Sequence, residues 1–304
     1  MLTKQTCRNI TWIDLESPTP SETRSLMEEY GLHFLVAEEL LTPTLRPKVD
    51  IYENCIYLIL HFPTVTHSHD KHSEQEIDFI IGKNFFITAH YGFIDSLDRE
   101  KRLFDVNAIL KKCNIGDHAG FLFFSMIKEL YATSIAELDV IHKNLDDIEN
   151  RIFKGEERLM VGVLSKMNRK LLNFKKAISQ HKEVLESLEI AGRKFFGPDF
   201  SYYLRAITGE YYKVAALLEG TKEISDELQE TNNSLLTTKT NDIMKTLTIM
   251  GVITFPSMLL ASLFSMNTDF WPIVGVRNDF WVIVGIMAAV TIGFFAFFKY
   301  KKWF

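Results

Sequence analysis

Cysteine and proline are scarce in this chain of 304 residues, which has 3 cysteines and 8 prolines. Three widely spaced cysteines without a CxxC pair exclude a disulfide scaffold and do not show the spacing of a zinc site. The motifs GxxxxGK[ST], GxSxG and HExxH are also missing, so an enzyme is not indicated. The formal net charge is −5, and we expect no nucleic-acid partner because such proteins carry a basic surface.

Charged residues are absent from two long stretches near the C-terminus. One stretch, 246–268, runs for 23 residues, and the other, 280–298, runs for 19. A helix of about 20 apolar residues crosses a bilayer core of roughly 30 Å. We therefore predict two transmembrane helices in a lipid bilayer, joined by an external loop at 269–279. An acidic soluble part precedes them.

Basic residues flank the two predicted spans on one side. Lys239 and Lys245 precede the first span, and the tail 299–304 reads KYKKWF. Positive charge at the ends of membrane helices marks the cytoplasmic side. The N-terminal stretch has no apolar segment of a signal peptide. We expect a multi-pass protein of the cytoplasmic (inner) membrane with both termini in the cytoplasm.

The first part of the chain, 1–120, mixes short strand patterns with short helix patterns. Alternating apolar residues predict strands, and Gly82–Lys83 between two such runs predicts a hairpin. These patterns favour a small cytoplasmic α/β or α+β domain. The predicted strands are Asn9–Leu15, two strands within Val49–Phe62, Gln75–Ile81 and Asn84–His90, and the predicted helices are Ser21–Tyr30 and Ala37–Leu41.

Apolar residues recur at spacings of three and four from Phe121 onward, which is typical of helices. Residues 121–200 predict a cytoplasmic helical hairpin, with helices at about 121–153 and 156–191. Gly197–Pro198 ends this region.

No proline occurs between Pro198 and Pro256. This gap allows one helix from Ser201 to about Phe264, roughly 95 Å long at 1.5 Å per residue. Its first part, 201–245, is a predicted stalk, and the rest is the first span, 246–268.

One face of the predicted stalk carries apolar residues and threonines at spacings of three and four. This face packs either on the helices of its own chain or on other copies around an axis. Two threonines make it a poor seam for a plain two-stranded coiled coil. Its members are Val214, Leu217, Thr221, Ile224, Leu228, Thr231 and Leu235.

The outer end of the first span carries the motif Ser265-Met266-Asn267, followed by Thr268-Asp269-Phe270-Trp271-Pro272. Upstream lies Thr240-Asn241-Asp242-Ile243-Met244-Lys245, Pro256 lies inside the span, and the chain ends in FFKYKKWF. Together these features resemble the CorA family of divalent-cation transporters. The resemblance implies a cytoplasmic α/β domain, a long stalk helix, two C-terminal transmembrane helices and a symmetric homopentamer. It also implies a Gly-Met-Asn signature at the outer pore mouth.

In that family the signature forms the selectivity filter, which would here comprise Ser265, Met266, Asn267 and Asp269. Mg²⁺ loses its waters reluctantly. A ring of neutral amide oxygens from Asn267 can hydrogen-bond a hydrated ion without trapping it. Asp269, just outside, can raise the local concentration of cations.

Ser265 stands where the family has glycine. Glycine supplies backbone freedom at the point where a helix gives way to a loop. Serine fits there if the local φ is negative or the strain is only about 1 kcal/mol. We expect the fold and the assembly to survive this serine, and ion selection or rate to suffer.

Two helices cannot enclose an aqueous path, so a pore requires several copies around an axis. The first span is the better pore candidate because it continues the stalk and carries hydroxyl side chains. By resemblance, Asn241 forms a polar ring, and Met244 and Leu247 form a hydrophobic constriction that gates by dewetting. Ordinary helix packing is the alternative for this face. The complete predicted pore-lining set is Asn241, Met244, Leu247, Thr248, Gly251 and Phe255.

Two groups of residues are candidate metal ligands outside the pore. By resemblance, Glu230, with Glu223 and Asp226 nearby, would belong to a regulatory Mg²⁺ site between subunits, although a solvated acidic face explains them as well. His67, His69 and His72 lie within eight residues and could bind a transition metal, although a solvated polar loop is the simpler interpretation.

Three functions fit these observations. The first is a CorA-type channel for Mg²⁺, and for Co²⁺ or Ni²⁺, gated by cytoplasmic divalent ions. The second is a zinc transporter with the same architecture, which would use Zn²⁺. The third is a membrane-anchored scaffold or sensor that conducts nothing.

Overall fold

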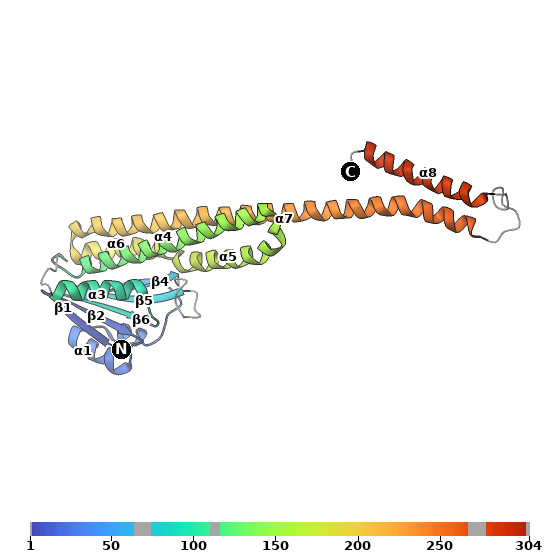
Figure 1. Ribbon diagram of the computed structural model, residues 1–304. Helices are drawn as coiled ribbons and strands as arrows, with labels where there is room; N and C mark the ends of the chain where they lie inside the picture. Colours follow the sequence, from blue (N-terminus) through green and yellow to red (C-terminus); the bar gives the residue numbers. More distant parts are fainter. Residues whose placement is uncertain (1, 64–73, 110–115, 267–277, 302–304) are drawn as a thin grey trace. The chain divides into compact units, whose positions relative to one another are not determined.

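The computed structural model describes residues 2–63, 74–109, 116–266 and 278–301 (Figure 1). The chain divides into two compact units, Met1–Gln229 and Glu230–Phe304. The first unit contains one sheet with helices on both faces, and the second contains two long apolar helix segments. This architecture confirms the predicted fold class, an α/β soluble part followed by long helices.

Six strands form the sheet, in the order β1-β2-β6-β5-β4-β3. The central pair β2 and β6 is parallel, and all other neighbours are antiparallel. The predicted strands and the hairpin are present, whereas β1, an edge strand with an exposed face, is an addition. The bounds are β1 Leu2–Cys7, β2 Ile10–Glu16, β3 Lys48–Ile51, β4 Cys55–Pro63, β5 Glu74–Gly82 and β6 Phe85–His90.

The central strands are buried on both faces because helices cover the sheet on both sides. Every residue of β4 is buried, and its sequence CIYLILHFP is nearly all apolar. Such continuous apolar runs are typical of strands enclosed between two layers. Two short helices, α1 (Pro20–Tyr30) and α2 (Phe34–Glu39), cover one face. Their buried Leu26 and Val36 pack in one core with Ile59 of the sheet.

The other face is covered by helices α3 to α6. Aromatic side chains fill this side: Trp12 and Phe104 meet edge to face at 5.5 Å, and Phe79 and Phe123 at 5.6 Å between centroids. Helix α3 was not anticipated from the sequence. The bounds are α3 Asp95–Ile109, α4 Gly120–Arg151, α5 Glu157–Ile178 and α6 His181–Phe196.

The prediction of one helix over 156–191 is wrong, because the structure has two helices, α5 and α6. The break lies at Ser179 and Gln180, where the Ser179 hydroxyl donates to the Lys176 carbonyl at 3.2 Å. Such local side-chain bonds compete with the helix ladder. No proline or glycine marks this break, so the sequence pattern alone did not reveal it.

Helix α7 runs from Ser201 to Phe264, 64 residues, as the sequence predicted. Pro256 lies inside it. Within the first unit, Val214, Thr221 and Leu228 of the predicted stalk face are buried, and the Ser225 hydroxyl donates to Asn168 of α5 at 2.7 Å. This part of the face therefore packs on helices of its own chain. Helix α8 runs from Asp279 to Tyr300.

His181, at the start of α6, is fully buried between helices and sheet. Its Nε2 donates to the His61 carbonyl at 2.8 Å, and its Nδ1 accepts from the Tyr131 hydroxyl at 2.9 Å. Both nitrogens are thus satisfied by the neutral ring. Burial lowers the pKa of His181 from 6.5 to about 3.

This burial predicts a specific acid sensitivity. Below pH 6.5 the unfolded chain takes up a proton that folded His181 excludes, so the free energy of unfolding falls by up to about 1.4 kcal/mol per pH unit until about pH 3. A His181→Gln variant keeps one donor and one acceptor but cannot ionise. We expect the thermal midpoint of the full chain in detergent to drop less between pH 7 and pH 5 in this variant than in the parent. Equal drops in both proteins would contradict the assignment.

Candidate functional site: an uncovered face of the first span

The second unit places α8 against the C-terminal part of α7. The Ser257 and Thr291 hydroxyls lie 3.0 Å apart and join the two helices. The Thr291 hydroxyl also donates to the Met287 carbonyl of its own helix at 2.9 Å. It therefore has one polar partner on each helix. Hydroxyl pairs of this kind hold helices together where no water competes. Helical spacing within each span does not predict this contact, because Ser257 and Thr291 lie on different helices.

Only one side of α7 in this unit is shielded by neighbouring residues. The shielded side chains recur at spacings of three and four, which defines one helix face. The side chain of Ile249 is 3% exposed and the others are half-buried. The members of this face are Ile249, Ile253, Pro256, Leu260 and Phe264.

Four of the six predicted pore-lining residues lie on the opposite face. Met244, Leu247, Gly251 and Phe255 each precede a shielded residue by nine positions, which is about 2.5 helical turns and hence half a turn away. Gly251 is half-buried, and the remaining five predicted residues are exposed, including Asn241 and Thr248. Phe255 is 71% exposed. The Thr248 hydroxyl donates to the Met244 carbonyl at 2.8 Å, so it does not interrupt the apolar surface with an unpaired donor.

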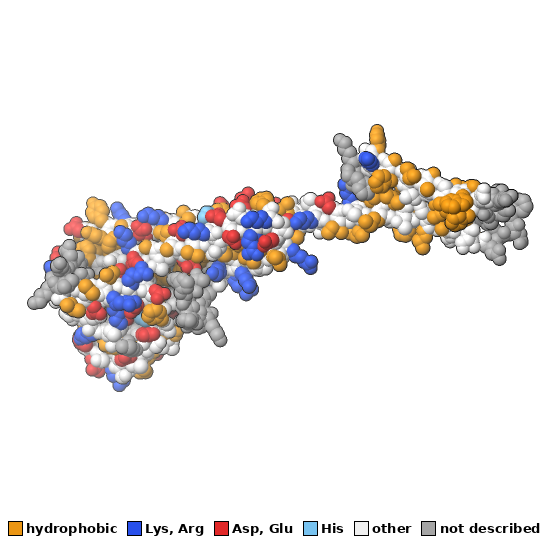
Figure 2. Space-filling view, viewed as in Figure 1, with side chains coloured by type: hydrophobic (Ala, Val, Ile, Leu, Met, Phe, Trp, Pro, Cys, Tyr) orange, Lys and Arg blue, Asp and Glu red, His pale blue; other side chains and the backbone are white. Residues whose placement is uncertain are grey.

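Both long apolar segments are exposed in the single chain. The most apolar windows of α7 and α8 have mean hydropathies of 1.9 and 2.3, and only 6% and 0% of those windows are buried. The visible surface of this unit is largely hydrophobic or uncharged, whereas charged side chains crowd the first unit (Figure 2). A soluble domain does not expose contiguous apolar surface of this extent. Core helices of a soluble protein would instead be buried.

Helix α7 ends at the predicted signature. Ser265 N–H donates to the Ala261 carbonyl at 3.1 Å, and Met266 N–H donates to the Leu263 carbonyl at 3.2 Å. Among described non-glycine residues, positive φ occurs at Arg8, Ser17 and Asn278. Ser265 therefore has an ordinary backbone conformation, and replacing the family's glycine introduces no left-handed strain here.

The remaining predicted filter residues, Asn267 and Asp269, lie outside the described residues, as do His67, His69 and His72. The structure therefore places the first half of the signature, at the end of α7, and leaves its second half as a prediction.

The acidic stalk candidates do not form a metal site within one chain. Glu223, Asp226 and Glu230 are exposed, and Asp226 pairs with Lys222 at 2.5 Å. Among the residues that the structure describes, no group of three or more His, Cys, Asp or Glu side chains could hold a metal ion. Any site that uses these acids needs ligands from elsewhere.

A family model described as CorA-like Mg²⁺ transporter protein matches residues 8–301. The chain belongs to the CorA family. CorA-family members are ion transporters with two C-terminal transmembrane helices, so the C-terminal part of α7 and α8 are membrane-spanning, and the chain is a transporter rather than an enzyme. These findings confirm the recognised family and the two C-terminal membrane helices of the predicted fold class.

Relatives and solved structures agree with this assignment. The cobalt/magnesium transport protein CorA of Thermotoga maritima is 27% identical over 297 residues, which cover 96% of this chain and 83% of that protein. The CorA magnesium transporter structure from Methanocaldococcus jannaschii superimposes with a TM-score of 0.85 at 19% identity, covering 97% of this chain and 92% of that one. The ZntB cytoplasmic domain of Vibrio parahaemolyticus shares the soluble fold, with a TM-score of 0.62 at 12% identity, covering 76% of this chain and 89% of that one.

Proposed function

We propose that five copies of this chain form a homopentamer that conducts Mg²⁺, and also Co²⁺ or Ni²⁺, across the cytoplasmic membrane. Both termini are cytoplasmic, and the loop 269–279 is external. The membrane part of α7 lines the pore, and α8 lies between α7 and the lipid.

The uncovered face of α7 is the observation that carries this proposal. It lies opposite the face shielded by the chain's own residues, it comprises Met244, Leu247, Gly251 and Phe255, and the exposed Asn241 and Thr248 border it. One copy cannot enclose water with two helices. Several copies arranged around an axis can cover this face by turning it inward, which also removes its exposed Leu247 and Phe255 from lipid.

Ion selection in this proposal takes place at the outer end of the pore. The Asn267 amide oxygens form a ring that hydrogen-bonds the waters of hydrated Mg²⁺, and Asp269 concentrates cations at the mouth. Neutral oxygens bind the hydrated ion weakly enough for release. Ser265, whose backbone is unstrained, can present the following Met266 and Asn267 as glycine does in the family.

The gate lies toward the cytoplasmic end of the same helix. Met244 and Leu247 occupy successive turns of the uncovered face and narrow the path with apolar side chains, which close a channel by excluding water. Asn241 adds a polar ring below them, and Gly251 leaves room above. Small rotations of α7 would change this constriction.

Cytoplasmic Mg²⁺ closes the channel in this proposal by binding between subunits. Glu230, with Glu223 and Asp226, contributes carboxylate oxygens, and the remaining ligands come from the neighbouring copy. No group of three such ligands exists within the described part of one chain. A site built on these acids would therefore take further ligands from a second copy. Loss of the ion would free the soluble units to separate.

Zinc transport is the second candidate function. The observations that favour it are the soluble fold shared with the ZntB cytoplasmic domain and the altered first position of the signature. A non-conducting scaffold or sensor is the outcome if no cation crosses.

Single cysteines test which face of α7 meets water. We expect cysteines at positions 244, 248 and 255 to react with a small aqueous thiol reagent about tenfold faster than cysteines at 249, 253 and 260, because a pore hydrates one helix face. Reaction is measured by mass shift in a variant without native cysteines. Faster reaction of cysteines on α8, at Ile286 or Val290, would contradict an α7-lined pore.

Liposome flux tests the filter. We expect the purified parent to pass Mg²⁺ in preference to Zn²⁺ and K⁺, and Asn267→Ala to reduce this preference by about tenfold, a change of about 1.4 kcal/mol in selection. Ser265→Gly serves as the matched neighbouring variant and should keep the preference while changing the rate. Size-exclusion chromatography must show an intact oligomer in both. An Asn267→Ala variant that selects Mg²⁺ like the parent would exclude the amide ring.

Limited proteolysis tests regulation. We expect EDTA to raise cleavage near the stalk severalfold over millimolar Mg²⁺, because a bound ligand stabilises the closed form by RT ln(1 + [L]/Kd). Glu230→Gln should show the EDTA pattern even in Mg²⁺, whereas Glu53→Gln, which changes an exposed acid between β3 and β4, should not. Identical digestion with and without Mg²⁺ would argue against a sensor.

A further inference from the structure

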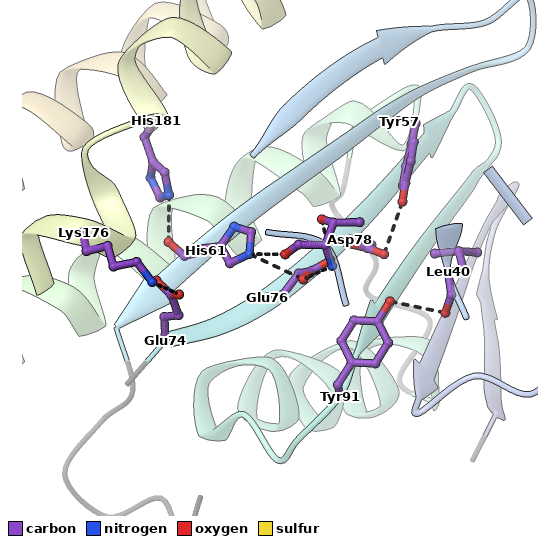
Figure 3. A network of polar contacts seen from close by, with 10 residues as sticks. Leu40, Tyr57, His61, Glu74, Glu76, Asp78, Tyr91, Lys176 and His181 are labelled. Carbon is purple, nitrogen blue, oxygen red and sulfur yellow. Dashed lines mark hydrogen bonds and ion pairs between the residues drawn. The ribbon is translucent and has the colours of Figure 1, made fainter. Parts of the chain in front are cut away.

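A polar network lies inside the first unit, far in sequence from the pore face. It connects β4, β5 and the segment 41–47, which joins α2 to β3 and has no regular secondary structure. We call this segment the strap. In Figure 3 the side chains of His61, Glu76 and Asp78 lie close together, and Tyr57 and Tyr91 lie near them. None of these residues belongs to the proposed ion path.

Thr44 fastens the strap to the sheet. Its N–H donates to both Glu76 carboxylate oxygens, at 2.7 and 3.0 Å, and its hydroxyl donates to Glu76 at 3.0 Å. His61 Nε2 donates to the Thr44 carbonyl at 2.9 Å. Within the part of the chain that the structure describes, the hydrogen bonds from the strap to the sheet all run through Thr44. The closure of the strap therefore depends on one His–Glu pair.

The strap covers a cavity of about 310 Å³. Pro43, Thr44 and Leu45 form one wall, and His61 and Glu76 lie on the other. Leu45 is 95% exposed, so it contributes little apolar contact to hold the strap down. Polar bonds at Thr44 rather than hydrophobic burial hold the strap against the sheet beside this cavity.

Two carboxyl groups occupy neighbouring same-face positions of β5. Glu76 and Asp78 are two residues apart on a strand, so their side chains point to one side. Asp78 is fully buried. One of its oxygens accepts from the Tyr57 hydroxyl at 3.4 Å, and the other has no hydrogen-bond partner. A buried carboxylate left in this state is costly, whereas a carboxylic acid can use its proton to satisfy a neighbour.

His61 is the cation nearest to this pair. Its Nε2 lies 3.4 Å from a Glu76 oxygen, and both side chains are less than one tenth exposed. Its Nδ1 is buried without a partner. The other charged or titratable groups around the network are already engaged or lie at its edge: Lys48 pairs with Glu39 at 2.5 Å, Lys176 pairs with Glu74 at 2.7 Å, the Tyr91 hydroxyl donates to the Leu40 carbonyl at 3.3 Å, and His181 donates to the His61 carbonyl.

We propose that His61, Glu76 and Asp78 form a proton-dependent latch, which holds the strap closed while Asp78 and His61 carry protons and releases it when they lose them. Protonated Asp78 lets Glu76 keep its charge beside it, and protonated His61 neutralises that charge. Glu76 can then accept all three bonds from Thr44, with His61 as its ion-pair partner. Deprotonation leaves two carboxylates side by side in a buried site without a cation.

The direction of the proton linkage agrees with this geometry. Burial raises the pKa of the Asp78 carboxyl well above 3.8, and the neighbouring Glu76 charge raises it further. Burial alone would lower the pKa of His61, but its bonds to Glu76 and to the Thr44 carbonyl outweigh burial and raise the pKa above 6.5. Both groups hold protons more tightly in this folded site, beside Glu76, than they would free in water. The latch is therefore strongest at low pH and weakens as the pH rises, for His61 through the range above 6.5.

Hydrogen exchange of the full chain in detergent tests the latch. The Thr44 amide is the reporter because it donates to Glu76, and both prolines of the strap, Pro43 and Pro47, lack amides. After correction for intrinsic exchange, we expect exchange at Thr44 to rise with pH between 6.5 and 8.5, by up to about tenfold per pH unit for each proton released. Peptides from α1 should show no such rise. A corrected rate at Thr44 that does not change with pH would overturn the proposal without any variant.

Variants separate the roles of the groups. Asp78→Asn mimics the protonated acid, so Thr44 should stay protected to higher pH, and adding His61→Gln should remove most of the remaining dependence. Glu76→Gln replaces an accepting oxygen with a donor and should leave Thr44 exchanging fast at every pH. Glu53→Gln, which removes one exposed charge, should behave like the parent. An unchanged pH dependence in the Asp78→Asn and His61→Gln double variant would contradict the latch. Since this test does not measure ion flux, it stands or falls independently of the proposed transport.

Discussion

A lipid bilayer offers no hydrogen bonds to a peptide backbone, and this constraint determines how the C-terminal part of the chain is built. Every N–H and C=O group inside the membrane must be paired within the chain, which only helices achieve in a segment of this length. The chain meets the constraint with one helix of 64 residues that begins in the soluble unit and ends at Phe264. Because the same helix serves both environments, its side chains must change from packing on soluble helices to facing lipid or water.

The residues that α7 buries differ between its two parts. In the first unit the helix buries Val214 and Leu218 against its own chain. In the second unit the face formed by Ile249 to Phe264 is shielded, and the opposite face is bare. The exposed Asn241 and Thr248 add polar groups along this side of the helix. Further copies of the chain can cover this face, which is the basis of the proposed pore.

The soluble unit follows other physical rules. Its sheet is enclosed by helices on both faces, so polar groups inside it need partners from the chain itself. His181 obtains two, from Tyr131 and from the backbone of His61, and stays neutral. Asp78 obtains only one, from Tyr57, at the long distance of 3.4 Å. The hydrogen bonds of His181 therefore have a structural role, whereas Asp78, with its one long hydrogen bond, is a group that we propose to respond to protons.

The sequence by itself determined the features that depend on long, uniform patterns. The two uncharged runs, the proline-free stretch before Pro256 and the strands around Gly82–Lys83 predicted helices α7 and α8 and the central hairpin, and the residues near the first span identified the family. These features depend on local periodicity and composition, which the chain carries in order. The shared face of Met244, Leu247, Gly251 and Phe255 was also predictable, because helical spacing alone places these four residues together.

Only the tertiary structure decided where periodic patterns end and which distant residues meet. The break at Ser179 has no proline or glycine, and it depends on a side-chain bond and on the burial of His181 between helix and sheet. The His61–Glu76–Asp78 network joins two strands and a strap, and the alternation of acids within β5 was the one sequence signal that could have indicated it. A buried charge is stable only through its partners, and partners supplied by separate segments are brought together by the fold rather than by spacing along the chain.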